Sequence, residues 1–265
     1  MPFGFTLFLI LTEAFLSILF PLFIGQAIDD TLANGNQGII NLGILCLILL
    51  IVGTGRRVFD SRYYAKRYQE IGTKVSLKSK DQDISTKSAR LTMLKEFVEF
   101  LEFSLPELIN ALIALLGSII IIAKLNLSVF AGTVLTTILV MTIYLFSSKK
   151  TMRYNKNSND EFENQVKTLA THDQHKMRIH LKKLMFWNVK LSDLEALNYS
   201  LVWILLTGLL LVSLNISVNN DFIQYGAIFS LVMYVFQYME GISQVPFYYQ
   251  NWLRLKEMSY RLFEY

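Results

Sequence analysis

Six apolar runs dominate this 265-residue sequence, and each is long enough to cross the hydrocarbon core of a bilayer as a helix. Backbone polar groups inside lipid must bond within their own segment, so runs of this kind form helices. We therefore predict an all-α polytopic membrane protein with six transmembrane helices, forming a single transmembrane domain over residues 1–265. The predicted spans are Phe3–Ile28, Ile39–Phe59, Leu105–Lys124, Asn126–Ser147, Tyr199–Ser217 and Phe222–Val245.

The overall composition agrees with a membrane protein and excludes several other classes. Apolar residues make up 53% of the chain and charged residues only 17%, whereas soluble domains carry about 25% charged residues. The single cysteine, Cys46, excludes a disulfide scaffold or a cysteine-rich zinc cluster. The first run is too long for a signal-peptide core and has no basic segment before it, so we interpret it as a retained helix.

The connections between the runs alternate between short and long. The short connection at 29–38 carries the turn pair Asn34-Gly35. The two long connections, 56–104 and 148–198, contain no proline and are rich in helix formers, so we predict two helical hairpins that extend the membrane helices. We expect their tips near Lys80–Ser85 and Thr171–His175. Ser104 and Glu107 fit a capping box that would open the third span.

The basic residues indicate how the chain is oriented. Of the 25 lysines and arginines, 24 fall in the two long connections and the C-terminal tail; only Lys124 does not. Because positive charge is enriched on the cytoplasmic side, we predict cytoplasmic hairpins, both termini in the cytoplasm and a plasma (inner) membrane location in a bacterium. This distribution also accounts for the pI near 9.0 without a nucleic-acid partner.

These features together resemble the transmembrane domain of ABC exporters, in a stand-alone form. The segment Pro21–Asp29, followed by a short loop, is similar to the end of their first helix. Arg56–Tyr68, with its repeated Arg/Tyr pattern, is similar to the descent into their first intracellular loop. Within the 265 residues, we find no counterpart of the amphipathic helix expected before the first span.

The resemblance implies a domain-swapped homodimer or heterodimer whose hairpin tips dock on nucleotide-binding domains. The tip residues expected to make these contacts are Asp81, Gln82, Asp83, His172 and Asp173. No G-x-x-x-x-G-K-[ST] motif occurs within the 265 residues, so we expect no enzymatic activity from this chain and no cofactor of its own. ATP and Mg²⁺ would be bound only by a separate ATPase partner.

The sixth run carries a polar stripe at helical spacing. A polar stripe on a membrane helix lines water or a polar interior, or else bonds to a neighbouring helix. We therefore predict that this stripe contacts substrate in a cavity, with helix–helix hydrogen bonding as the alternative. The candidate residues in it are Ser230, Tyr234, Gln237, Glu240 and Gln244.

Glu13 is a second acid placed inside a predicted span. A carboxylate there is costly unless it is paired, hydrated or protonated. Two interpretations remain open: a proton or cation site, together with Glu240, or a neutral acid hydrogen-bonded between helices. No basic residue in the spans offers an evident partner. We also expect no metal site and no catalytic residue set.

Three functions remain open at this point. The first is the permease subunit of an ABC-type exporter that moves a small amphipathic or cationic substrate with a separate ATPase. The second is a transporter on the same fold driven by a proton or ion gradient, which Glu13 and Glu240 would support. The third is a membrane scaffold or sensor that transports nothing.

Overall fold

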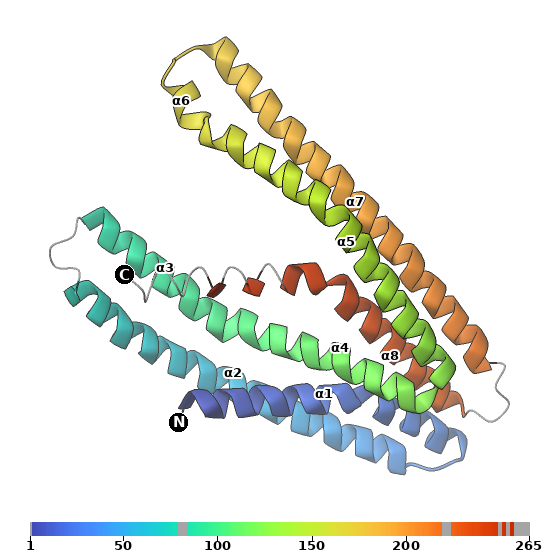
Figure 1. Ribbon diagram of the computed structural model, residues 1–265. Helices are drawn as coiled ribbons and strands as arrows, with labels where there is room; N and C mark the ends of the chain where they lie inside the picture. The colour runs from blue at the N-terminus through green and yellow to red at the C-terminus, as the bar shows by residue number, and fades with distance from the viewer. Residues whose placement is uncertain (1, 79–83, 219–223, 249–250, 253–254, 257–265) are drawn as a thin grey trace. The chain divides into compact units, whose positions relative to one another are not determined.

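The computed structural model describes residues 2–78, 84–218, 224–248, 251–252 and 255–256. The described chain is almost wholly helical and contains no strand, which confirms the all-α prediction (Figure 1). The elements are α1 (Pro2–Leu32), α2 (Gln37–Lys78), α3 (Ile84–Glu99), the π-helical turn η1 (Phe100–Ser104), α4 (Leu105–Leu125), α5 (Leu127–Glu163), α6 (Gln165–Leu169), α7 (Gln174–Val218) and α8 (Tyr225–Ser243).

Five helical stretches of the described chain are long and apolar enough to cross a membrane. They correspond to α1, α2, the continuous α3–η1–α4 segment, α5 with α6, and α7. α8 is not among the five, because tyrosines, Gln237 and Glu240 lower its hydropathy. The chain is thus an integral membrane protein of several spans, while a sixth span remains a prediction.

The chain divides into two compact units, and the first comprises 1–127 and 213–265. Within it, α1 packs against α2, α4 and α8, and α2 packs against α3. The turn between α1 and α2 is fixed by Asp30, whose Oδ2 accepts a hydrogen bond from the Gly38 amide at 2.7 Å. Asn34 adopts φ 62°, a left-handed conformation that asparagine tolerates, so the expected turn lies where the Asn-Gly pair places it.

α1 and α8 pack antiparallel along a line of close polar contacts. The Gly226 amide donates to Asp29 Oδ1 at 2.7 Å, the Ser230 hydroxyl donates to the Pro21 carbonyl at 2.8 Å, and the Tyr234 hydroxyl donates to the Ile18 carbonyl at 2.6 Å. Gly25 and Gly226 meet at this seam, where neither position leaves space for a Cβ atom. Small residues at such contacts allow helix backbones to approach closely in membranes.

The expected capping box at the start of the third span does not form. Ser104 has a helical backbone conformation and makes no side-chain capping bond, because the helix continues from α3 through η1 into α4. The π-helical turn ends two residues before Pro106, which lacks the amide hydrogen that a regular helix would use. Glu107 is therefore not used as a cap.

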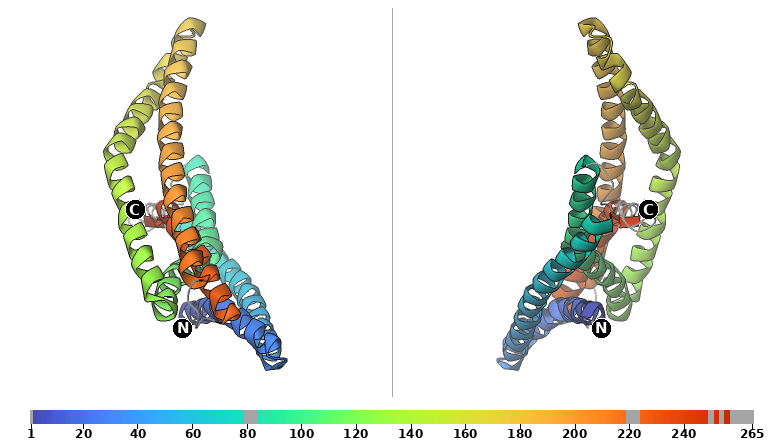
Figure 2. Two further views of the ribbon diagram at one scale, coloured as in Figure 1. Left: turned by 90° about the vertical axis from the view of Figure 1, so that its right-hand side faces the viewer. Right: turned by 90° about the vertical axis from the view of Figure 1, so that its left-hand side faces the viewer.

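The second unit, 128–212, comprises α5, α6 and most of α7. α5 and α7 run antiparallel, as the views together show (Figures 1 and 2). The Ser147 hydroxyl donates to Asn198 Oδ1 at 2.6 Å, and the Ser158 hydroxyl donates to Asn188 Oδ1 at 3.0 Å. α6 and the turn at 170–173 lie at the far end of this hairpin, in the region where the second tip is expected.

Candidate functional site

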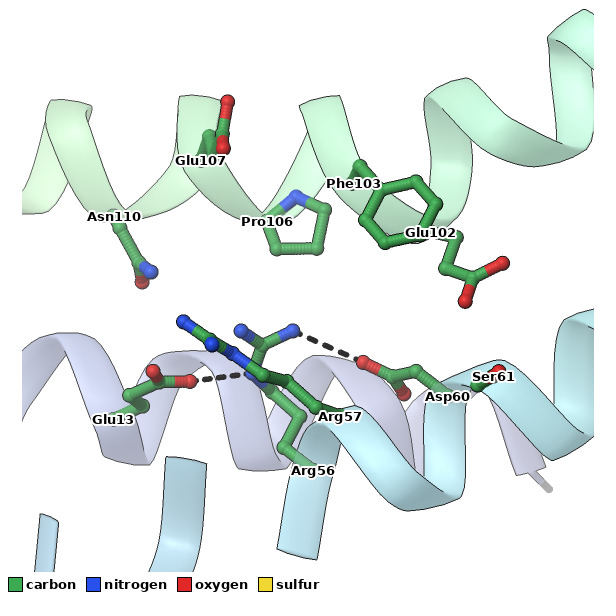
Figure 3. Close-up of a pocket in the computed structure, with 10 residues that line it drawn as sticks. All are labelled: Glu13, Arg56, Arg57, Asp60, Ser61, Glu102, Phe103, Pro106, Glu107 and Asn110. Atoms are coloured by element: carbon green, nitrogen blue, oxygen red, sulfur yellow. Dashed lines mark hydrogen bonds and ion pairs between the residues drawn. The ribbon is translucent and has the colours of Figure 1, made fainter. Parts of the chain in front are cut away.

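A buried ion-pair triad lies between α1 and α2. Arg56 Nε donates to Glu13 Oε2, and Arg56 Nη1 donates to Asp60 Oδ2 at 3.0 Å (Figure 3). The side chains of Arg56, Glu13 and Asp60 are only 8%, 15% and 2% exposed. The expectation that no basic residue in the spans could pair with Glu13 is therefore wrong. Arg56 lies within the predicted second span, and Glu13 is held in an ion pair that neither earlier interpretation included.

The triad forms one wall of a pocket of about 470 Å³, which we call the Arg56 pocket. α4 and η1 form the facing wall, from which Glu102 and Asn110 extend toward the side of the two arginines (Figure 3). Glu107 of α4 also lines the pocket. Four carboxylates and two guanidinium groups line this pocket, and one of those guanidinium groups already bridges two of the carboxylates. The lining residues are Glu13, Arg56, Arg57, Asp60, Ser61, Glu102, Phe103, Pro106, Glu107 and Asn110.

A second pocket of about 320 Å³, the α8 pocket, lies between α1, α4 and α8. Glu107 and Asn110 border both pockets. The described residues that line the α8 pocket include two carboxylates, Glu107 and Glu240, and no basic side chain. They are Ala14, Ser17, Ile18, Glu107, Asn110, Ala111, Ala114, Gln237, Glu240, Gly241, Gln244 and Tyr248.

The structure separates the five candidate residues of the polar stripe into two groups. Gln237, Glu240 and Gln244 line the α8 pocket, as a substrate-contacting role would require. Ser230 and Tyr234 do not line this pocket. They are buried where α8 meets α1, and their hydroxyls donate to backbone carbonyls of α1. The bonds of Ser230 and Tyr234 agree with the helix–helix alternative. Substrate contact by Gln237, Glu240 and Gln244 stays a prediction.

Polar groups in the α8 pocket form a short chain of hydrogen bonds. The Tyr248 hydroxyl donates to Gln244 Oε1 at 3.1 Å, and Gln244 Nε2 lies 3.5 Å from Glu240 Oε1. Burial raises the pKa of the Tyr248 phenol, and the negative charge of Glu240 adds to the effect, so this group stays a neutral donor. Among the residues that line this pocket, Asn110 Oδ1 and Gln237 Oε1 are buried without a hydrogen-bond partner.

Sequence reasoning missed Arg56 and Asn110 as lining residues, and it treated Glu107 only as a cap. A signal for Arg56 was present, because Arg56 and Asp60 are spaced i, i+4 at the end of an apolar run. Asn110 and Glu107 are spaced i, i+3 and so share one helix face. Nothing in the sequence indicates that this face meets α1 and α8.

The expected docking residues at the tips have different outcomes. Asp81, Gln82 and Asp83 lie outside the described residues. His172 is exposed in a left-handed conformation with φ 51°. Asp173 caps α7, because its Oδ1 accepts hydrogen bonds from the amides of His175 at 2.9 Å and Lys176 at 3.3 Å.

Comparison with known proteins identifies the class of this chain. Residues 2–226 match the family described as the ABC transporter transmembrane region, which covers most of the sequence. The chain therefore belongs to that family, and the resemblance inferred from topology and loop lengths is confirmed. No curated protein shows significant similarity to it.

Proposed function

We propose that the chain is the transmembrane subunit of an ATP-driven transporter and that the α8 pocket binds a small amphipathic cation. The observation that supports this most strongly is the charge of the pocket. Glu107 and Glu240 line it without a compensating basic side chain among the described residues, beside small apolar positions such as Ala111, Ala114 and Gly241. Ligand pockets typically combine an apolar lining of this kind with a few placed polar groups.

Family membership favours ATP hydrolysis by a separate protein over an ion gradient. The gradient-driven alternative drew its support from two intramembrane acids acting together. Glu13 is paired with Arg56 and lies in the Arg56 pocket, whereas Glu240 lies in the α8 pocket. The proposed partners are a second six-helix chain and an ATPase that docks on the hairpin tips, where His172 is exposed.

The cation proposal predicts that charge, and not shape, decides which ligand the pocket takes. Tetraphenylphosphonium and tetraphenylborate have nearly the same shape and opposite charge. We expect the purified protein to bind the phosphonium more tightly. In the Glu107→Gln/Glu240→Gln variant, its affinity should fall by roughly tenfold or more, because each carboxylate contributes on the order of 1 kcal/mol at partly solvated distances. Equilibrium dialysis in detergent micelles measures both ligands.

The matched control for this experiment is Glu99→Gln. Glu99 is an exposed acid of α3 that lines neither pocket, so this variant should bind the phosphonium like the original chain. Equal affinity for the two ions, or a phosphonium affinity that the double variant leaves unchanged, would remove the support for a cationic substrate.

A further inference from the structure

A third pocket lies at the far end of the hairpin of the second unit, next to the tip at His172. Its volume is about 350 Å³, and we call it the hairpin pocket. The lining residues are Glu161, Asn164, Lys167, Thr168, Thr171, Lys176, Ile179, His180 and Lys183.

Two helix faces bring these side chains together. Asn164, Lys167, Thr168 and Thr171 are spaced i, i+3, i+4 and i+7 along α6 and its flanking turns. Lys176, His180 and Lys183 follow an equivalent spacing on α7, as the residue numbers show. Side chains at these spacings lie on one face of a helix, so each element presents a polar, basic face to the pocket.

His180 is the buried member of this site. Its side chain is 3% exposed, and Nδ1 lies 2.9 Å from Glu161 Oε1. Its other ring nitrogen, Nε2, is buried and has no hydrogen-bond partner among the described residues. Buried polar atoms in folded proteins are nearly always partnered, so the unpaired imidazole nitrogen calls for a partner, either a water molecule or a bound ligand.

The charges around His180 specify the kind of ligand. Three lysines line the pocket against the single carboxylate of Glu161. Lys176 lies 3.9 Å from Asp173, and both are well exposed, while Lys167 and Lys183 form no ion pair within the described chain. The hydroxyls of Thr168 and Thr171 already donate to backbone carbonyls. The free donors are therefore the lysine ammonium groups, and His180 adds an Nε2 donor when its imidazole carries both protons, with Nδ1–H directed to Glu161. Such donors suit an anion with several acceptor oxygens.

We propose that the hairpin pocket binds a phosphate-bearing anion through Lys167, Lys183 and His180, with Glu161 orienting the imidazole. This inference does not depend on the proposed transport function. The phosphate could belong to a soluble compound or to a lipid headgroup. About 20 Å of helix separates Glu161 from the predicted end of the span at Ser147, which favours the soluble source.

The test uses the purified full chain in nanodiscs of phosphatidylcholine, titrated with inorganic phosphate by calorimetry at constant ionic strength. We expect one saturable phosphate per chain. His180→Gln and Lys183→Gln should each weaken binding by about tenfold, the loss of one charge-assisted hydrogen bond. Lys182→Gln and His175→Gln are the matched controls, because both residues are exposed on α7 and neither lines the pocket.

The outcomes are distinct. Absence of saturable binding, or equal losses in the two control variants, overturns the proposal. Lys183 is exposed, so Lys183→Gln keeps the test valid if His180→Gln misfolds. Repeating the titration in phosphatidylglycerol nanodiscs separates the two sources. A lower apparent phosphate affinity there identifies a lipid headgroup as the occupant, whereas an unchanged affinity identifies a soluble phosphate.

Discussion

Replacing Arg56 by glutamine should destabilise the protein by about 3–5 kcal/mol, the largest effect expected of any single polar substitution among the described residues. The change leaves Glu13 and Asp60 buried and close together without the guanidinium that bridges them. The attraction of a buried pair only offsets the cost of removing its charges from water, so the loss of one partner leaves that cost uncompensated. The free energy of unfolding in mixed micelles of increasing denaturing detergent measures the effect.

Two further variants make this prediction specific to the buried triad. Arg67 forms an ion pair with Glu70 at 2.7 Å, but both side chains are more than 40% exposed. Arg67→Gln should therefore change stability by less than about 1 kcal/mol. The triple variant Glu13→Gln, Arg56→Gln, Asp60→Asn should recover most of the loss, since no charge remains buried in it. An Arg56→Gln protein as stable as Arg67→Gln would show that the triad is not buried as described.

Alanine at Gly226 should force α1 and α8 apart and cost about 2–4 kcal/mol, which combines overpacking with weakened hydrogen bonds. A Cβ atom there would overlap the backbone carbonyl of Gly25, and the converse substitution would overlap the carbonyl of Gly226. Backbone atoms cannot rotate away as a flexible side chain can. The hydrogen bonds of Ser230 and Tyr234 to α1 depend on the same close approach.

The control for this prediction is a glycine in the same unit with open space around it. A Cβ atom at Gly43 in α2 would meet nothing within 4 Å. Gly43→Ala should therefore leave stability unchanged or raise it slightly, because alanine favours the helix. The same unfolding titration compares the two variants. Equal stability of Gly226→Ala and Gly43→Ala would contradict the close packing of α1 on α8.

The sequence predicts the helices better than the contacts between them. Apolar runs identify α1, α2, α4, α5 and α7, and Asn34-Gly35 marks a turn, because these signals are local. The pairing of Glu13 with Arg56 is different, since it joins residues 43 positions apart and depends on how α1 and α2 align.

In the candidate site too, the sequence predicts a helix, α8, but not the contacts that each part of it makes. Periodicity groups Ser230, Tyr234, Gln237, Glu240 and Gln244 on one stripe of α8. The packing of α8 on α1, with Gly226 against Gly25, places the first two residues at α1, and the last three line a pocket. The sequence predicts a cap at Glu107 because the capping signature is a local pattern. The continuity of α3 into α4, which removes the need for a cap, has no such local signal.

Uptake by membrane vesicles from the native host tests most directly whether ATP drives a cation through this chain. Radiolabelled tetraphenylphosphonium is supplied with ATP in the presence of a protonophore, which removes ion gradients. We expect ATP-dependent movement that falls several-fold in the Glu107→Gln/Glu240→Gln variant. It should also fall in His172→Asp/Asp173→Asn, in which the asparagine keeps the cap of α7. Movement that needs no ATP and stops with the protonophore, or that is the same in vesicles lacking the chain, would contradict the account.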